Sequence, residues 1–544
     1  MAVMMALAGS GMYRIFFTSI YYTLLTINTD SYAVVTDCTS VNKNRRLVHE
    51  RQQKEPPISK LIPELLATTF DFVLQSTVNR IRGHVQSFDP RTSLNFTYVC
   101  RRWRSVALNT PQLWRRLPFT YRKWTQVMLE RSKKSDLVIE MDFGGFGRSS
   151  LPILWRMRHV IIEHADRIRE IEFHEIANAQ LKYLLDDIPD SSVRLTSLVL
   201  TRSHGLKYAI PTSFIADLQR LQSLHISGFG FPWDSQPLCA LTHLRVECTP
   251  EPPPITSFFA ALRAMPALQA LDLANSLPET CDTRDIEPIS FRHLRRLHLV
   301  SQTGLPNVLS VIAVPTDTII YLHCTKPDYR LAPSLSEFFS SMGIWEPKRP
   351  SYRNLDIPGP FSLCLTGGET STNTPRFSLD FSHSFMEDII PSIPFQDLSS
   401  LSLFHSIPAK TFLESFGNCQ RLEVITFYGD AITGWTKAMQ TINEMALESQ
   451  VDAVPFPGLH TISITRAPLG GEEDINFKVL ESWLRERHNH NLGLRTLSLT
   501  SCRRIREPEV QSLARLVDDV IWEGGLSRGS KLSVFHHGLR LDIR

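Results

Sequence analysis

The hydrophobic positions from residue 160 onward repeat one short pattern: apolar, two variable, apolar, one variable, apolar. The last two apolar positions of each copy lie two residues apart, so in a strand both side chains point to the same side. The pattern therefore predicts a series of short strands, each with one face buried. Its eleven copies are Ile168-Ile171-Phe173, Leu195-Leu198-Leu200, Leu221-Leu224-Ile226, Leu241-Leu244-Val246, Leu268-Leu271-Leu273, Leu294-Leu297-Leu299, Ile319-Leu322-Cys324, Leu398-Leu401-Leu403, Leu422-Ile425-Phe427, Leu459-Ile462-Ile464 and Leu494-Leu497-Leu499.

The spacing of these strands is nearly even. Across the first seven copies the third positions are 27, 26, 20, 27, 26 and 25 residues apart. Between two of the strands, Phe258, Leu262 and Met265 fall on one helical stripe, as expected of a helix that packs on a sheet. A period of about 20–29 residues is typical of leucine-rich repeats. We therefore predict an α/β fold over residues 130–544, a leucine-rich-repeat solenoid or horseshoe.

The predicted array is irregular in three places. The pattern fades between residues 324 and 403, and steps of 37 and 35 residues precede the strands that end at Ile464 and Leu499. Long loops on such a fold serve as binding elements about as often as structural ones. We expect irregular loops near residues 343–376, 433–457 and 470–491.

Other runs mark the ends and the interior of the array. Ile139-Met141-Phe143 is expected to open it, and Leu532–Ile543 to close it. Leu494–Leu513 resembles the cysteine-containing class of leucine-rich repeat. Within the irregular region, Phe361–Leu365 and Phe377–Phe381 look like strands.

Residues 58–118 differ in character from the repeats. Proline at the first helical position and a carboxylate beside it favour a helix that begins at Pro63-Glu64. Its apolar positions form two lines about 100° apart, so one face can pack within a small domain while the other meets a partner. A second helix is predicted from Thr92 to Leu108. The two lines of the first helix are Leu66, Phe70 and Val73, and Leu65 and Phe72.

Three runs in this segment resemble an F-box, in particular the F-box that opens many leucine-rich-repeat proteins of mushroom-forming fungi. The usual first proline is Ile62 here, and residues 71–92 make a longer and more polar connection than the minimal motif. The runs are Leu61-Ile62-Pro63-Glu64-Leu65-Leu66 with Phe70, Val99-Cys100-Arg101-Arg102-Trp103, and Pro111-Gln112-Leu113-Trp114.

The resemblance implies a small all-helical F-box and a substrate receptor of an SCF-type cullin–RING ubiquitin ligase. In that family the F-box docks on a Skp-family adaptor, and the repeats hold a protein substrate. Trp103 is expected to carry most weight, because large aromatic side chains dominate buried interfaces. The positions that match adaptor contacts or the F-box core are Leu61, Pro63, Leu65, Leu66, Phe70, Val99, Cys100 and Trp103.

A second interpretation needs no ligase. The chain can be a non-catalytic leucine-rich-repeat scaffold whose F-box-like segment is only an N-terminal cap, since terminal repeats need atypical caps. In both interpretations the chain holds other proteins and performs no chemistry.

The first 57 residues are expected to form a disordered or targeting-like extension and a linker. Residues 1–29 contain no acidic group, and Ile15–Ile27 is mostly apolar behind Arg14. A membrane span needs about 20 apolar residues, so we expect no membrane partner.

Charge and composition favour an ordinary globular chain. Lys and Arg number 58 and Asp and Glu 55, a formal charge of +3, and apolar residues make up 42%. Basic residues gather in Arg101–Lys134, but the small total charge and the lack of a nucleic-acid motif favour an acidic protein surface or plain solvation. We expect no nucleic-acid partner.

The sequence favours no enzyme, metal or cofactor. Asp142-Phe143-Gly144 matches one protein-kinase motif without its companions, and no phosphate-binding loop or nucleophile elbow is present. The nine cysteines contain no C-x-x-C pair. They are typical of small buried residues in a reducing compartment, so the cytoplasm, the nucleus or both are expected.

Overall fold

The computed structural model describes residues 61–543, and the chain divides into two units between Thr69 and Phe70. The predicted extension 1–57 lies outside the described residues, and the predicted boundaries 58–118 and 130–544 stay predictions. The segments left out of the description are 77–79, 82–83, 86–89, 91–93, 145–150, 186–193, 203–209, 211–217, 235–237, 280–285, 327–329, 343–351, 360–361, 368–376, 382–388, 394, 396, 418, 450–454, 470–474, 524–531 and 537–538.

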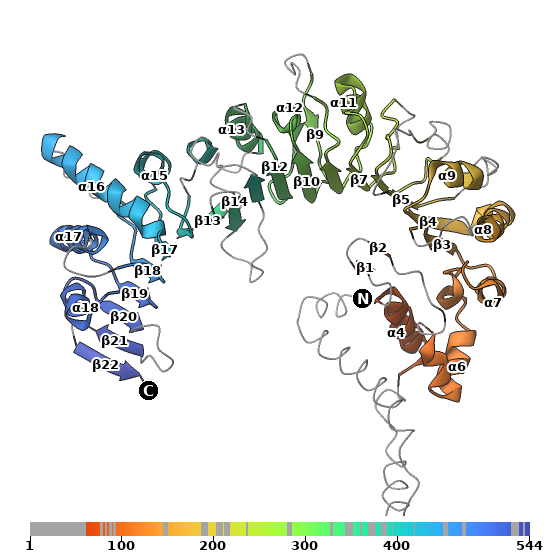
Figure 1. The fold of residues 1–544 in the computed structure, drawn as a ribbon, viewed down its shortest axis with the longest axis horizontal. Coiled ribbons are helices and arrows are strands. Elements are labelled where there is room, and N and C mark those ends of the chain that lie inside the picture. The colour runs from red at the N-terminus through yellow and green to blue at the C-terminus, as the bar shows by residue number, and fades with distance from the viewer. Residues whose placement is uncertain are drawn as a thin grey trace, which may run out of the picture. The chain divides into compact units, whose positions relative to one another are not determined.

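A long, mostly parallel sheet dominates the second unit (Figure 1). Its first strands pair in chain order, and all are parallel. They are β3 (Leu137–Asp142), β4 (Ile168–His174), β5 (Ser197–Thr201), β6 (Ser223–Ser227), β7 (His243–Glu247), β8 (Ala270–Ala274), β10 (Arg296–Ser301) and β12 (Ile319–Cys324).

The sheet continues in the C-terminal part of the chain with a second parallel series. Two antiparallel strands follow it, in the segment where the sequence predicts the end of the array. The strands are β16 (Ser400–Leu403), β17 (Val424–Tyr428), β18 (Thr461–Thr465), β19 (Thr496–Thr500), β20 (Asp519–Glu523), β21 (Leu532–His536) and β22 (Leu539–Ile543).

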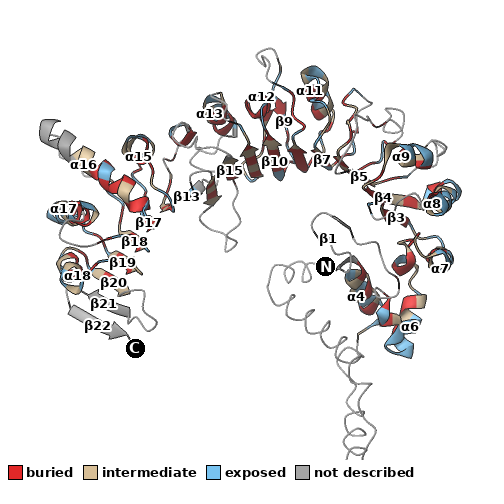
Figure 2. Cartoon of the chain, in the orientation of Figure 1, coloured by how far each residue is buried: buried red, intermediate tan, exposed pale blue. Residues whose placement is uncertain are grey.

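Helices α8 to α18 cover one side of this sheet, and none of these helices lies on its other side (Figure 1). Buried residues follow the strands and the helix sides turned toward them (Figure 2). We call the uncovered side the open face. The helices that accompany the sheet are α8 (Leu151–Glu163), α9 (Asn178–Leu185), α11 (Ile255–Arg263), α12 (Leu305–Leu309), α13 (Leu331–Met342), α15 (Ala409–Phe416), α16 (Ala431–Ser449), α17 (Ile475–Asn489) and α18 (Glu507–Leu513), with the short η5 (Ala165–Arg167), η6 (Ile390–Ser392) and the strand pair β9 (Ile289–Ser290) and β11 (Ile312–Ala313).

The strand register confirms the pattern read from the sequence. Leu198 and Leu200 pair with Leu224 and Ile226, and the same buried rows continue from strand to strand. One copy is shifted: Ile320 and Leu322 pair with Leu297 and Leu299, so Leu322 and Cys324 are not its two final positions. The adjacent residues Ile319 and Ile320 both fit the apolar pattern, and strand alternation buries only Ile320.

A left-handed residue follows the strand in many repeats, a feature that the sequence analysis missed. Its N–H donates to the last strand residue of the next repeat, as Cys248 does to Ala274 O at 2.7 Å and Arg466 to Thr500 O at 2.9 Å. At Gly228 a Cβ would lie 2.2 Å from Arg202 O, so only glycine fits there. The residues with this positive φ are Glu175, Gly228, Cys248, Asn275, Gly429, Arg466 and Ser501.

The predicted loop at 343–376 contains an antiparallel hairpin instead. Strands β13 (Tyr352–Gly359), β14 (Ser362–Gly367) and β15 (Phe377–Phe381) join the two parallel series in the order β12, β15, β14, β13, β16. Leu355 and Ile357 give β13 its buried side. Pro358 hides this strand from pattern analysis, and the ladder is irregular beside it.

The other two predicted loops are also wrong in part. Residues 433–449 belong to α16, where Ile432, Trp435 and Met439 are buried at helical spacing. Residues 475–489 form α17, with Leu480, Trp483 and Leu484 buried. Both insertions lengthen the helix that packs on the sheet, so the strand register stays intact.

The described part of the F-box-like segment is mainly helical. A single helix from Thr92 to Leu108 is not observed, because Cys100 is extended and interrupts it. Two short strands also occur, so this segment is not wholly helical. Its elements are α4 (Pro63–Ser76), β1 (Arg80–Ile81), β2 (His84–Val85), η2 (Asn95–Tyr98), α6 (Arg101–Leu108) and η3 (Pro111–Trp114), and α7 (Arg122–Ser132) follows it.

Candidate functional site

Helix α4 separates the apolar positions of the first F-box-like run. Leu66 and Phe70 are buried, one helical turn apart, whereas Leu65 is 38% exposed. Ile62, which stands where the usual proline is missing, is 56% exposed, and Phe72 is 50% exposed. The wide apolar arc predicted from the sequence is therefore a buried line and an exposed line.

Trp103 belongs to the core of the segment. Its ring centroid lies 5.2 Å from that of Phe70, which stacks on Phe96 at 4.3 Å. Only 7% of Trp103 is exposed. Its large apolar area is therefore already covered by this chain, and the expectation that Trp103 carries most of a partner interface stays without structural support.

The residues just before α6 are the exposed ones. Tyr98 is 67% and Val99 43% exposed, and Cys100 is exposed while its Sγ accepts a hydrogen bond from Trp103 N at 3.4 Å. The sequence analysis did not single out Tyr98. Of the eight residues expected at this site, Leu66, Phe70 and Trp103 are buried, Pro63, Leu65, Val99 and Cys100 are exposed, and Leu61 is half-buried.

The end of the F-box-like segment extends the sheet. Leu117 N donates to Val138 O at 3.4 Å, and Val138 N donates to Arg115 O at 3.0 Å, so this stretch lies along the edge of β3. Arg116 forms an ion pair with the buried Glu140. Burial, with Glu172 next to it, raises the pKa of Glu140 although Arg116 opposes the shift.

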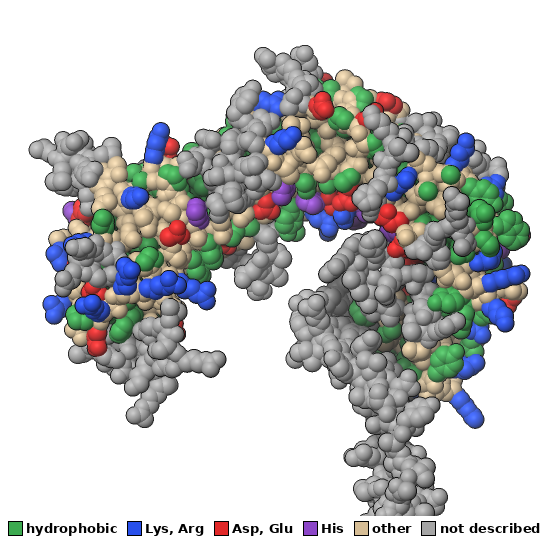
Figure 3. Space-filling view, in the orientation of Figure 1, with side chains coloured by type: hydrophobic (Ala, Val, Ile, Leu, Met, Phe, Trp, Pro, Cys, Tyr) green, Lys and Arg blue, Asp and Glu red, His purple; other side chains and the backbone are tan. Residues whose placement is uncertain are grey.

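The open face carries a row of charged and imidazole side chains across neighbouring strands. Figure 3 shows acidic, basic and histidine side chains gathered along this side of the sheet. They come from the middle position of each strand, which the parallel register aligns. The charged row consists of Glu140, Glu172, His225, Arg245, Asp272 and His298, continued by Tyr321 and interrupted by Val199. Glu140, Glu172 and Asp272 are buried among their neighbours, whereas Arg245 is exposed.

Ion pairs hold the centre of the charged row. The Arg245 guanidinium lies 2.6 Å from Glu247 Oε1 and 3.7 Å from Asp272 Oδ2. His298 Nδ1 lies 2.8 Å from Asp272 Oδ1, and His225 Nε2 lies 3.2 Å from Glu247 Oε2. Burial alone would raise the pKa of Glu247, but hydrogen bonds from His225 and Arg245 lower it to about 2.

The open face changes chemistry toward the C-terminus. There the middle positions are small hydroxyl side chains, and Ser402, Thr426, Ser463 and Ser498 align across four strands. The charged groups of the open face are therefore concentrated on its N-terminal half. This asymmetry makes that half the better candidate for selective recognition of a partner.

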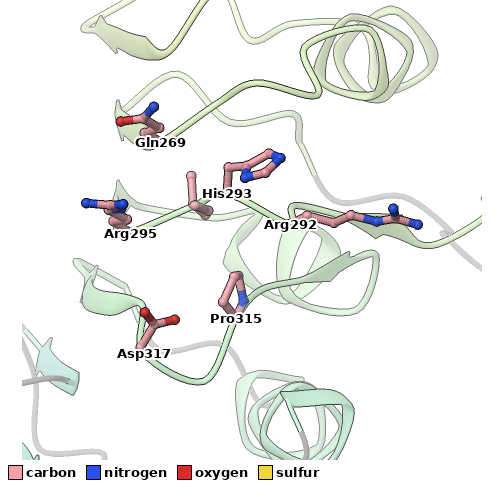
Figure 4. Close-up of a pocket in the computed structure, with 7 residues that line it drawn as sticks. Gln269, Arg292, His293, Arg295, Pro315 and Asp317 are labelled. Atoms are coloured by element: carbon pink, nitrogen blue, oxygen red, sulfur yellow. The ribbon is translucent and has the colours of Figure 1, made fainter.

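A hollow at the N-terminal ends of β8, β10 and β12 is a weaker candidate. Its lining includes Gln269, Arg292, Arg295 and Asp317. In Figure 4, Arg292 and Arg295 point to opposite sides, so their charges do not converge on one ligand.

The described residues also bear on the chemistry expected of the chain. Among them no group of three His, Cys, Asp or Glu side chains could hold a metal ion. No described helix is long and apolar enough to cross a membrane. The cysteines are of both kinds: Cys419 and Cys502 are buried as expected, whereas Cys239 and Cys248 are exposed.

Fold and surfaces together define a strand-and-helix α/β protein with an uncovered sheet face. No family model matches the chain, and no curated protein matches it. A solved leucine-rich-repeat protein of Leptospira interrogans is 11% identical, with a TM-score of 0.27 over 76% of this chain and 98% of that chain. That degree of similarity carries no conclusion for this chain.

Proposed function

We propose that this chain is a non-catalytic adaptor, the substrate-recognition subunit of an SCF-type cullin–RING ubiquitin ligase. The F-box-like segment docks on a Skp-family adaptor, and the leucine-rich-repeat sheet holds a protein substrate on its open face. The observation that carries the proposal is the exposure of Tyr98 and Val99 in the second unit, where Phe70 and Trp103 already fill the core of the segment. Leu65, in the first unit, is exposed as well. Exposed apolar side chains beside a complete core are typical of interaction sites.

The open face supports the second half of the proposal. Its central polar side chains are held in place by their strands and by pairs such as Arg245–Glu247 and His298–Asp272. A partner can bind to such a preorganised surface without a change in the conformation of the sheet. The mechanism is proximity, since holding a substrate beside a charged ubiquitin carrier raises its effective concentration.

The docking step can be tested with the full chain and a purified Skp-family adaptor. Val99→Asp and Leu65→Asp should each abolish co-purification while the circular dichroism spectrum stays unchanged. Ile475→Asp is the matched control, because Ile475 is 63% exposed on α17. Failure of the wild type to bind, or equal binding by the variants, contradicts the proposal.

The substrate half has a separate test. Proteins labelled by a proximity enzyme fused to the chain, with the proteasome inhibited, should include some that disappear with Arg245→Glu. Ser463→Glu places the same charge in the hydroxyl part of the open face and is the control. Identical labelling by wild type and Arg245→Glu contradicts a role of the charged row.

The scaffold interpretation is also favoured by one observation, the pairing of Arg115 and Leu117 with Val138. If the segment acts as a cap, residues 111–544 should fold and residues 119–544 should not, because only the second deletion exposes the edge of β3. Circular dichroism and limited proteolysis of both truncations compare them. A folded 119–544 fragment contradicts the cap.

A further inference from the structure

The outer side of α8 carries an apolar stripe that the proposed function does not use. Leu151 is 72%, Trp155 61% and Ile162 37% exposed. With His159 they follow one another at helical spacing over about 16 Å. We call Leu151, Trp155, His159 and Ile162 the α8 stripe.

The stripe is not needed to hold α8 on the sheet. The opposite side of the helix is already apolar and buried, through Leu154, Met157, Val160 and Ile161. Figure 3 shows hydrophobic side chains gathered over α8 and α9. Scattered exposed apolar residues need no explanation, but a continuous stripe on a helix indicates a binding surface.

The stripe is ordered by its neighbours. The Trp155 and His159 rings stack at 5.4 Å with an angle of 11° between their planes, so each ring limits the motion of the other. On α9, Tyr183 is 40% exposed, and the Arg158 guanidinium lies 4.8 Å from its ring. These contacts hold the exposed aromatic rings of α8 and α9 in place for a partner side chain.

Arg156 follows Trp155 in α8 and places a positive charge beside the stripe, with Arg122 of α7 near it. Arg156 donates to Phe119 O at 2.9 Å, and its pKa is lowered by burial and by the nearby Arg122 of α7. At the C-terminal end of α8, Glu163 is already paired with His159 at 3.3 Å. An acidic group placed between Arg122 and Arg156 would relieve their repulsion.

We propose that the α8 stripe binds an amphipathic helix of another protein, with apolar residues along its contact line and acidic residues beside them. A helix fits because Leu151, Trp155 and His159 form an i, i+4 ridge of α8, and such a ridge packs into a groove of a second helix. An anionic membrane would meet Glu163 and Asp166 beside Ile162.

This surface lies on the side of the sheet opposite the open face, so both can be occupied together. It goes beyond the proposed function and does not depend on it. Four side chains bury only a small area, so the complex is expected to be of the weak, transient kind.

The test places a photocrosslinking residue in the full chain within cells, by Trp155→p-benzoylphenylalanine. Ile475→p-benzoylphenylalanine is the control, because Ile475 is 63% exposed on a different helix. We expect an adduct at position 155 alone, mapped to an apolar and acidic helical segment of another protein.

The mapped segment is then synthesised and titrated into the purified full chain by fluorescence anisotropy. Trp155→Glu should weaken binding by about tenfold or more, as loss of an interface aromatic does, while Ile475→Glu leaves it unchanged. Added salt should weaken binding as well. Equal binding by Trp155→Glu, the same adducts at both positions, no adduct, or an adduct with another copy of the chain overturns the proposal. So does Trp155-dependent sedimentation with phosphatidylcholine–phosphatidylserine vesicles.

Discussion

Arg245 and Glu247 lie on the same strand, two residues apart, and their side chains meet on the open face at 2.6 Å. Both point away from the core because strand alternation places Leu244 and Val246 inside. The pair is thus fixed by the strand itself. Burial would raise the pKa of Glu247, but the hydrogen bonds from His225 and from Arg245 lower it to about 2.

This pair makes stability depend on pH in acid. A carboxyl whose pKa is lowered in the folded chain stabilises the fold above its unfolded pKa of about 4.3, and the contribution is lost as the pH falls toward the folded pKa. The melting-temperature difference between wild type and Glu247→Gln should therefore be constant above about pH 5 and shrink below it. Glu414→Gln, on exposed α15 opposite Lys410 at 3.8 Å, should show no such change. Parallel curves for wild type and Glu247→Gln would refute the assignment.

Substitutions at Trp103 and at Val99 are expected to differ strongly in their effect on the stability of the fold. Trp103→Ala empties a site packed on Phe70 and should destabilise the chain by about 3–5 kcal/mol. Val99→Ala removes an exposed side chain and should change the free energy of unfolding by less than about 0.5 kcal/mol. Urea unfolding measures both. A mild effect of Trp103→Ala would contradict its place in the core.

Gly434 of α16 should tolerate no side chain. A Cβ there would lie 2.1 Å from Ile407 O, which is backbone and cannot move aside cheaply. Gly434→Ala should lower the melting temperature clearly, with a cost of about 1–3 kcal/mol as for other overpacked sites. Gly493→Ala is the control, since its nearest neighbour would be His488 Nδ1 at 4.0 Å. Equal melting of the two variants would show that α16 and residue 407 do not approach so closely.

Arg487 is expected to be structural although it is charged. It is 1% exposed, and its guanidinium donates to the carbonyls of Pro455, Phe456 and Leu459 at 2.9 Å. Arg487→Met leaves these acceptors without their donor and should cost about 3 kcal/mol in urea unfolding. Arg485→Met on the same helix loses only an exposed pair with Glu481 and should cost less than about 0.5 kcal/mol. Similar losses for both variants would contradict the role of Arg487.

Buried cysteines should react more slowly with an alkylating reagent than exposed ones. Burial raises the pKa of Cys419 to about 12 and is the main cause that raises that of Cys502 to about 11, so neither forms the reactive thiolate near neutral pH. Cys100 and Cys248 are exposed. Iodoacetamide labelling of the native chain, mapped by mass spectrometry, should modify these two cysteines before Cys419 and Cys502. Early modification of Cys419 would contradict its burial.

The sequence predicts the strands well because their signal is local. Leu198 and Leu200 sit two residues apart, and burial of one strand side leaves no other choice of register. Strand β13 and helix α16 are not predicted, for two different reasons. Pro358 lies within β13, and proline argues against a strand. In α16, Trp435 and Met439 have helical spacing, but the segment lengthens the repeat and is therefore interpreted as an inserted loop.

The candidate surfaces are less predictable, because they depend on which chain segments become neighbours. Nothing local distinguishes Trp103, which packs on Phe70, from Val99, which stays outside. The pairing of His225 with Glu247 joins residues from two strands, and only the parallel register brings them together. The α8 stripe was present in the sequence, but its exposure depends on the opposite side of the helix meeting the sheet.

The hairpin β13–β14 divides the long sheet in a way that bears on how it folds. In a regular array each repeat packs only on its neighbours, so folding can begin in one repeat and propagate to the next. Here β12 pairs with β15 and β16 with β13, so the two parallel series are joined through the antiparallel ladder of β13, β14 and β15. Strands that are neighbours in the sheet are far apart in the sequence at this point. We therefore expect the two parallel series to unfold as separate cooperative blocks.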